Sequence, residues 1–328
     1  MEQKIAFFTE GMHVSQFGAP QDRNHTNCRT DVAWQIALEA IHFPITLPNQ
    51  KRMAGEYDLG IVILPKKGLG KLMTIDFMDE IHRVCKKVAI MQEGPNWNWQ
   101  DYTMEEQMWY YNTLMSADFL LCHNNSDINY YKGLTGKNTY VMQSLMIEDT
   151  IKEHASIKEN RTDHRKRVMI GGNMCSWYGG FDSMIVANEF DTGLMAPSMG
   201  RKIPREDELD IKYLPYMDWT TWMKTLNECK YGVHLMRTHA AGTFALNCAY
   251  LGIPCIGYKG LDTQEILHPL TTVAVGDLKS AKDIAHRLKT DKEFYDKCST
   301  NTKIFYEGYN ENMYVFQMNE ICINEGIK

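Results

Sequence analysis

A short apolar run followed by a polar, glycine-containing loop lies within Val233–Ile256, VHLMRTHAAGTFALNCAYLGIPCI. The apolar run Val233–Met236 predicts a buried parallel strand, and the small residues around Gly242 and Thr243 predict the start of a helix. Arg237 lies in the loop between them. Such loops bind ligands in open α/β sheets, and the free amides and dipole at a helix start favour an anion. The segment therefore predicts a site for a phosphorylated ligand.

A second glycine-rich segment, VMIGGNMCSWYGG, begins at Val168 and places Gly171 and Gly172 directly after a strand-like run. Glycines in that position let backbone N–H groups approach a pyrophosphate, and a tight strand-to-helix turn is the alternative explanation. The segment matches neither GxGxxG nor GxxxxGK[ST], so neither a nicotinamide-binding enzyme nor a P-loop enzyme is indicated. The two segments together predict a diphosphate site, to which Arg201 or Lys202 adds a further positive group.

The run RTHAAGTFALNCAYLGIPCIGY resembles the nucleotide-sugar site of GT-B glycosyltransferases, where a glycine-rich helix start leads into a short helix and a G-x-P turn. The resemblance covers residues 168–277 best. It implies a nucleoside-diphosphate sugar as donor, such as a UDP-sugar, and no required cofactor.

Many retaining members of that fold carry two glutamates eight positions apart at this helix start, where this chain has His239 and Asn247. The resemblance implies that both side chains can still hydrogen-bond the donor. A polar loop residue and a helix-surface residue are the alternative explanations. The missing carboxylates favour inversion, with a base supplied by the other half of the chain.

Three side chains in the first half are candidates for that base. Glu93 directly follows an apolar run and precedes Trp97 and Trp99, beside which a carboxylate would be desolvated and its pKa raised. His13 lies in the loop after the first predicted strand, where many inverting members of the fold place a histidine. Asp31 stands at a predicted helix start, where interaction with the helix dipole is the alternative explanation. Glu93 is the preferred base.

The segment QEGPNWNW around Glu93 is also similar to the region where phage DNA β-glucosyltransferases carry their base. That resemblance implies transfer to a hydroxymethylated base flipped out of duplex DNA, with Trp97 and Trp99 on the acceptor side. A net charge of −6 argues against DNA as the acceptor, because DNA binders use a basic face. A transferase for a surface or capsular glycan stays open, as does a nucleotide-sugar epimerase or non-catalytic nucleotide-sugar binder. No DxD pair is placed to hold a metal, so a metal-independent, inverting transferase is predicted.

Strand-like and helix-like runs alternate along both halves of the chain, as in parallel βαβ units. The 328 residues exceed the usual size of a single core, and residues 151–167 are polar and without periodicity. We therefore predict an α/β protein of two Rossmann-like domains, a GT-B architecture with an interdomain cleft. Residues 1–150 form the acceptor-side domain, 151–167 a linker and 168–305 the nucleotide-sugar domain. Residues 306–328 are predicted as a helix that crosses back to the first domain.

Several boundaries follow from local signals. Thr30 is predicted to cap a helix over Asp31–Ile41, and a strand is predicted over Ile45–Leu47. A helix is predicted over Met73–Cys85.

Composition limits the setting of the protein. Apolar residues make up 44% of the chain, as in soluble globular proteins, and no run approaches the roughly 20 apolar residues of a membrane span. Nine cysteines occur without a CxxC pair and read as buried free thiols. These features predict a cytoplasmic protein, in the host cytoplasm if phage-encoded, with no membrane partner and no metal.

Overall fold

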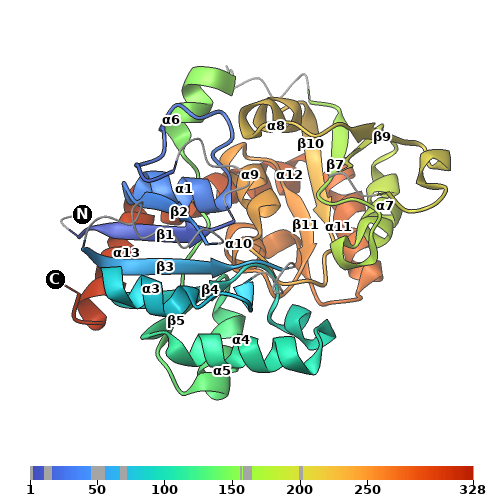
Figure 1. Cartoon of the computed structure of the whole chain (residues 1–328). Coiled ribbons are helices and arrows are strands. Elements are labelled where there is room, and N and C mark those ends of the chain that lie inside the picture. Colours follow the sequence, from blue (N-terminus) through green and yellow to red (C-terminus); the bar gives the residue numbers. More distant parts are fainter. Residues whose placement is uncertain are drawn as a thin grey trace. The chain divides into compact units, whose positions relative to one another are not determined.

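The computed structural model of the chain describes residues 3–10, 17–45, 56–66, 72–155, 157, 165–198 and 202–327 (Figure 1). The chain divides into two compact units. Unit 1 combines Met1–Ile147 with Glu311–Lys328, and unit 2 is Glu148–Asn310. The described residues of each unit form one six-stranded parallel sheet with helices around it. The predicted pair of Rossmann-like units is therefore confirmed.

Unit 1 carries the sheet drawn from blue to green in Figure 1, in the order β2-β1-β3-β4-β5-β6. Its strands are β1 (Ile5–Thr9), β2 (Ile41–Pro44), β3 (Tyr57–Leu64), β4 (Cys85–Gln92), β5 (Phe119–Cys122) and β6 (Thr139–Val141). Its helices include α1 (Thr30–Ala37), α3 (Phe77–Val84), α4 (Met104–Ser116), α5 (Asn125–Thr135) and α13 (Glu311–Asn324), with the 3₁₀ turn η1 (Asn96–Asp101). All residues of β1 and β5 are buried, as expected of parallel strands covered on both faces.

Unit 2 carries the second sheet, in the order β12-β11-β10-β7-β8-β9. Its strands are β7 (Arg167–Ile170), β8 (Leu194–Pro197), β9 (Ile211–Leu214), β10 (Cys229–His234), β11 (Cys255–Tyr258) and β12 (Thr272–Val273). Its helices include α6 (Glu148–Thr150), α7 (Gly180–Ala187), α8 (Trp219–Leu226), α9 (Thr243–Tyr250), α10 (Asp262–Leu267), α11 (Leu278–Thr290) and α12 (Lys292–Tyr306).

Both sheets have a point where the strand order reverses. In unit 1 the chain adds β2 on one side of β1 and β3 on the other, so the reversal lies between β1 and β3. In unit 2 it lies between β7 and β10. Open α/β sheets bind ligands outside the carboxyl ends of the strands at such a reversal. The residues that follow β1, β3, β7 and β10 are therefore candidates for a ligand site.

Some predicted boundaries are wrong. Thr30 is the first residue of α1 rather than its cap, and α1 ends at Ala37, because the chain turns into β2 at Ile41. The strand predicted over Ile45–Leu47 is replaced by β2; Leu47 itself lies outside the described residues. The helix predicted over Met73–Cys85 is shorter, since α3 begins at Phe77 and Cys85 opens β4.

In unit 2 the strand predicted over Val233–Met236 is β10, Cys229–His234, so Leu235 and Met236 belong to the loop that follows. The predicted linker contains α6 and the π-helical turn Ile151–Ala155 at its start, and β7 begins at Arg167. All nine cysteine side chains are buried, as predicted. In the described part of the chain, every helix is too short or too polar to cross a bilayer.

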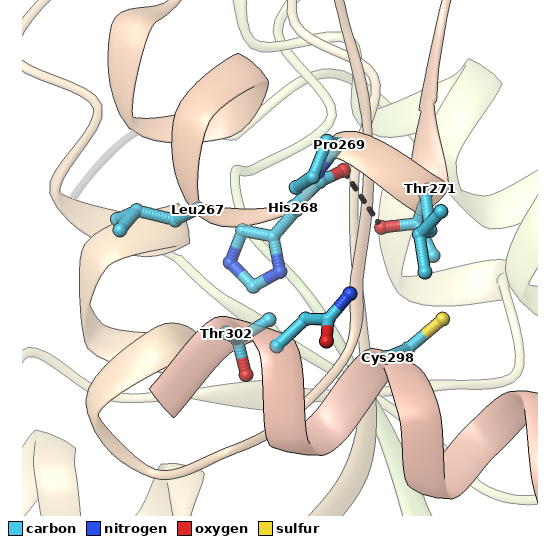
Figure 2. Close-up of a pocket in the computed structure, with 8 residues that line it drawn as sticks. Leu267, His268, Pro269, Thr271, Cys298 and Thr302 are labelled. Carbon is cyan, nitrogen blue, oxygen red and sulfur yellow. Dashed lines mark hydrogen bonds between the residues drawn. The ribbon is translucent and has the colours of Figure 1, made fainter. Parts of the chain in front are cut away.

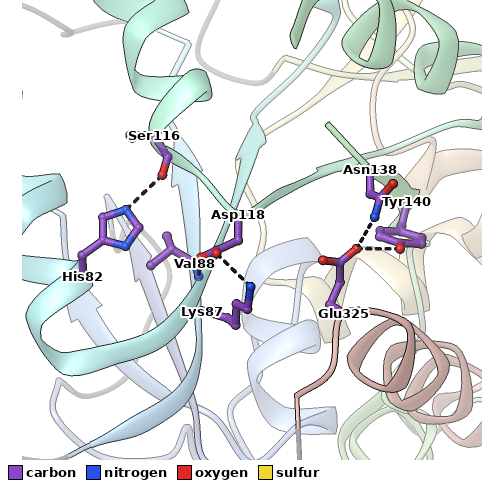
Figure 3. Close-up of polar contacts among 8 residues, drawn as sticks. All are labelled: His82, Lys87, Val88, Ser116, Asp118, Asn138, Tyr140 and Glu325. Carbon is purple, nitrogen blue, oxygen red and sulfur yellow. Dashed lines mark hydrogen bonds and ion pairs between the residues drawn. The ribbon is translucent and has the colours of Figure 1, made fainter. Parts of the chain in front are cut away.

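The C-terminal segment is fixed to the edge strand of the first sheet. The carboxylate of Glu325, just after α13, accepts hydrogen bonds from Asn138 Nδ2 at 2.8 Å and Tyr140 Oη at 2.7 Å (Figure 3). Burial and this carboxylate raise the pKa of Tyr140 to about 12. The inner strands are joined by a second acid, since Asp118 accepts from the Val88 amide and pairs with Lys87. Glu325 thus joins the end of the chain to β6.

Glu325→Ala is expected to loosen this attachment by about 1–2 kcal/mol, because two hydrogen bonds to one carboxylate are lost at a partly exposed site. Hydrogen exchange of the α13 amides in the native protein measures the loss locally. Glu320→Ala, at an exposed position of the same helix, is the control and should leave exchange unchanged. Equal exchange in wild type and Glu325→Ala would contradict the assignment.

Candidate functional site

Three carboxylates gather at the carboxyl edge of the first sheet. Glu10 follows β1, Glu93 follows β4, and Asp31 lies in the first turn of α1. They are close enough that the charge of Glu93 raises the pKa of both Glu10 and Asp31. This is the edge where the strand order reverses, so the cluster lies where an α/β unit binds its ligand.

Asp31 is the most strongly perturbed of the three. Burial, and secondarily the charge of Glu93, raises its pKa from an ordinary 3.8 to about 6. Hydrogen bonds from the backbone amides of Asp31 and Val32 and from the Thr9 hydroxyl act in the opposite direction. A carboxylate that is ionised just above pH 6 but poorly solvated has the properties of a general base at neutral pH.

The backbone next to Asp31 is also unusual. Thr30 has φ of +30°, a region that β-branched residues rarely adopt. Residues held in such conformations cluster at functional sites, where the surrounding structure fixes them. The strain supports a functional reading of the start of α1.

Glu93 does not have the surroundings predicted for it. Its side chain is 50% exposed and forms an ion pair with Lys66 at 3.2 Å. The burial predicted for Glu93 beside the two tryptophans is therefore not found. Trp99 packs away from the cluster, stacking on Tyr110 and donating its indole N–H to Tyr130 Oη at 2.6 Å. Trp97 is 39% exposed, and its acceptor-side role stays a prediction.

Two residues of unit 1 at or near this edge were not predicted from the sequence. His123 directly follows β5, stacks on Trp34, and has a pKa lowered to about 3 by burial and by Lys66. Its Nδ1 is buried without a hydrogen-bond partner among the described residues. Lys66, after β3, is the second, and it pairs with Glu93. His13 lies outside the described residues.

In unit 2 the glycines after β7 have packing roles. The Gly171 amide donates to Val233 O at 2.9 Å, so it supplies no hydrogen bond to a phosphate, contrary to prediction. A Cβ at Gly171 would lie 2.5 Å from the ring of His234, and one at Gly172 would lie 2.7 Å from Tyr178 Cβ. The Gly172 amide makes no hydrogen bond within the described chain and stays a candidate.

The start of α9 matches the prediction more closely. Gly242 precedes the helix with φ of +65° and no side chain caps its first amides, so those donors are free to meet an anion. Thr263 fixes this turn by donating its hydroxyl to Gly242 O at 2.9 Å. His234 contributes a buried imidazole beside Phe244, the second residue of α9, and its Nε2 has no partner among the described residues.

Cationic side chains flank this helix start. Arg237, in the loop after β10, is 59% exposed and pairs with Asp182 at 3.2 Å. His239 packs against Gly260 so closely that a Cβ there would meet its ring at 1.9 Å. Lys259 precedes Gly260, is exposed, and forms no ion pair with the described residues. The loops after β10 and β11 therefore touch, and they carry Arg237, His239 and Lys259.

Other predicted donor residues are engaged elsewhere. Asn247 is buried. With its amide turned to satisfy both neighbours, it accepts from Trp222 Nε1 at 2.9 Å and donates to Thr243 O at 3.1 Å, so its hydrogen bond to the donor stays a prediction. Lys202 pairs with Asp207 at 2.6 Å on an exposed loop. Arg201 lies outside the described residues.

The recess shown in Figure 2 lies in unit 2, between the segment Leu267–Thr271 and α12. Its histidine is fully engaged, since His268 Nδ1 accepts from the Cys255 amide and Nε2 donates to Ala245 O. Burial lowers the pKa of His268 to about 4, consistent with a neutral structural imidazole. Among the described residues, no three His, Cys, Asp or Glu side chains are grouped to hold a metal ion.

No protein-family model matches the chain, and no curated protein sequence does. Solved structures, in contrast, match the chain. An alpha-glucosyltransferase in complex with UDP and a 13-mer DNA containing an HMU base has a TM-score of 0.65 at 13% identity, covering 98% of this chain and 99% of that chain. HepE from Anabaena in complex with UDP and glucose gives 0.61 at 12% identity, with 98% and 100% covered. Sucrose-phosphate synthase from Thermosynechococcus elongatus gives 0.64 at 10% identity, with 98% and 99% covered. These likenesses show that the chain has the predicted GT-B fold.

Proposed function

We propose that the chain is a glycosyltransferase that moves a sugar from a UDP-sugar to a hydroxyl acceptor. The observation that carries this is the partly buried Asp31 carboxylate at the reversal point of the first sheet, whose pKa is raised to about 6. The start of α9 with its flanking cations suits a diphosphate. Two of the similar structures hold UDP, which supports UDP as the nucleotide.

In the proposed reaction Asp31 accepts the proton of the acceptor hydroxyl as the oxygen attacks the anomeric carbon. The bond from that carbon to the β-phosphate oxygen breaks, and UDP departs with the electron pair. The free amides at α9, Arg237, Thr243 and Lys259 balance the growing charge on the leaving group. A single displacement inverts the anomeric configuration, with Asp31 as the proposed base.

For the acceptor we propose duplex DNA carrying a hydroxymethylated base. The support is the similarity to the alpha-glucosyltransferase bound to DNA with an HMU base, together with the exposed Trp97 after β4 as a stacking group. A glycan acceptor is the second possibility, since the net charge of −6 is unusual for a DNA binder.

The test offers labelled UDP-glucose with three acceptors: duplex DNA with hydroxymethylated pyrimidines, the same duplex unmodified, and a mixture of oligosaccharides. Label on the hydroxymethylated duplex alone supports the proposal, and label on oligosaccharide overturns the DNA acceptor. NMR of the product decides the stereochemistry, because an α-linked product from UDP-α-glucose would contradict inversion. UDP binding without transfer to any acceptor would favour an epimerase or a non-catalytic binder.

Arg237→Ala and Lys259→Ala should each weaken UDP binding about 10- to 100-fold, the effect of losing one charge-assisted hydrogen bond of about 1.5–3 kcal/mol. Calorimetric titration with UDP measures the Kd. Lys279→Ala, in the exposed Lys279–Asp283 pair of α11 in the same unit, is the matched control and should bind UDP normally. A normal Kd in either site variant would remove that residue from the donor site.

A further inference from the structure

Two buried polar side chains connect β2 to the start of α1. Thr9 is the last residue of β1, and its Oγ1 lies 2.9 Å from His42 Nε2 on the neighbouring strand β2. Both side chains are almost completely buried. The same Thr9 hydroxyl hydrogen-bonds to the Asp31 carboxylate. Thr9 thus stands between a histidine and the proposed base.

Counting hydrogens fixes the direction of this chain of bonds. An ionised carboxylate can only accept, so the single hydroxyl proton of Thr9 is donated to Asp31. His42 Nε2 must then carry a proton and donate it to Thr9 Oγ1. Burial lowers the pKa of His42 to about 4, so the ring is neutral and its Nδ1 carries no proton. That Nδ1 is buried without a partner among the described residues.

We infer that Thr9 and His42 are positioning residues that hold the Asp31 carboxylate in its ionised form and in one orientation. The inference rests on the proposed role of Asp31. His42 orients the Thr9 hydroxyl, and the hydroxyl offsets part of what burial of the carboxylate costs. Among the described charges, the carboxylate of Glu93 acts on Asp31 and opposes its ionisation, and Glu93 is itself paired with Lys66. Glu10 belongs to the same cluster, because burial and then the charge of Glu93 raise its pKa.

The experiment compares Thr9→Val with Thr9→Ser in the full chain. Valine keeps the shape of threonine but cannot donate, whereas serine keeps the hydroxyl. For Thr9→Val we expect the acidic limb of the pH profile of kcat/KM to move up by about one pH unit, the worth of one hydrogen bond. We also expect kcat to fall about 10-fold while KM for UDP-glucose stays constant. Thr9→Ser should behave as wild type.

His42→Phe keeps an aromatic ring on β2 but removes the donor to Thr9, and should shift the acidic limb in the same direction by less. A Thr9→Val profile identical to wild type, or a Thr9→Ser variant as impaired as Thr9→Val, would overturn the inference. Either result would leave Asp31 as base untouched.

A direct titration separates this inference from the proposed function. The ¹³C shift of the Asp31 carboxyl, followed by NMR between pH 4 and 9 without substrate, reports its ionisation whether or not the chain transfers a sugar. A higher Asp31 pKa in Thr9→Val than in wild type and Thr9→Ser supports the positioning role even in an inactive protein. Equal values in all three contradict it.

Discussion

Asp31→Asn is expected to lower the rate of sugar transfer by roughly 10²–10⁴-fold, the usual contribution of a general base. Asparagine fills the same space and can still accept from Thr9, so UDP binding in unit 2 should be unchanged. In the wild-type protein kcat/KM should fall as the pH drops through about 6, because the base is then protonated. Steady-state rates with UDP-glucose, alongside the Kd of UDP, measure both effects.

Glu93→Gln is the matched control for this prediction. Glu93 is half exposed and paired with Lys66, so its loss should lower the rate modestly. It should also move the acidic limb of the pH profile to lower pH, because the charge of Glu93 raises the pKa of Asp31. Full inactivation by Glu93→Gln with an active Asp31→Asn would exchange the two roles and restore Glu93 as the base.

Asp31→Asn should also change stability in a pH-dependent way. A carboxyl whose folded-state pKa is raised binds a proton more tightly when folded, so the wild type loses stability as the pH rises from about 4 to about 6. Above pH 6 the neutral asparagine avoids this cost, which is on the order of 2–3 kcal/mol at about 1.4 kcal/mol per pKa unit. Thermal unfolding at pH 8 should therefore show a variant at least as stable as wild type. A markedly less stable variant would mean that its inactivity reflects unfolding.

Gly242→Ala is expected to damage both the stability of unit 2 and donor binding. The residue has φ of +65°, and a Cβ would lie 2.1 Å from Thr263 Oγ1, whose hydroxyl holds the Gly242 carbonyl. Left-handed strain costs about 1–2 kcal/mol, and disturbing a buried hydrogen bond costs a further 1–3 kcal/mol or so. The first amides of α9 would move with the turn, so the affinity for UDP should fall with the stability. Urea denaturation and UDP titration measure the two losses.

Gly276→Ala separates these causes. Gly276 has φ of +86° in the same unit, but a Cβ there would meet no atom within 4 Å. It should cost only the backbone strain and leave UDP binding intact. Combining Gly242→Ala with Thr263→Ala should recover the part of the loss that is due to the contact. Gly242→Ala with normal UDP affinity would show that the start of α9 does not hold the donor.

The parallel architecture could be predicted from the sequence because fully buried strands leave continuous apolar runs. β5, Phe119–Cys122, is such a run and is buried at every position. Boundaries set by tertiary packing could not be predicted. Cys85 is predicted to end the helix over Met73–Cys85, but its pairing with Tyr57 on β3 makes it the first residue of β4.

The donor site was predictable in part, since a left-handed glycine before a short helix has a local signature at Gly242. The identity of the base was less accessible. Desolvation depends on what covers a side chain, and sequence neighbours such as Trp97 and Trp99 do not reveal that. The two side chains that act on the pKa of Asp31, Glu93 and Thr9, are distant from it in sequence. The place of Lys259 in the site could not be predicted from the sequence, because the loops after β10 and β11 meet at Gly260 only in the folded chain.

The inclusion of α13 in unit 1 has a consequence for biosynthesis. Unit 2 is a continuous stretch of chain, whereas unit 1 needs both the first and the last residues to be complete. A ribosome that adds about 5–20 residues per second synthesises the whole of unit 2 before Glu325 can bond to Asn138 and Tyr140. During that time the nascent unit 1 lacks α13, and the side chains of Asn138 and Tyr140 are without their bonds to Glu325.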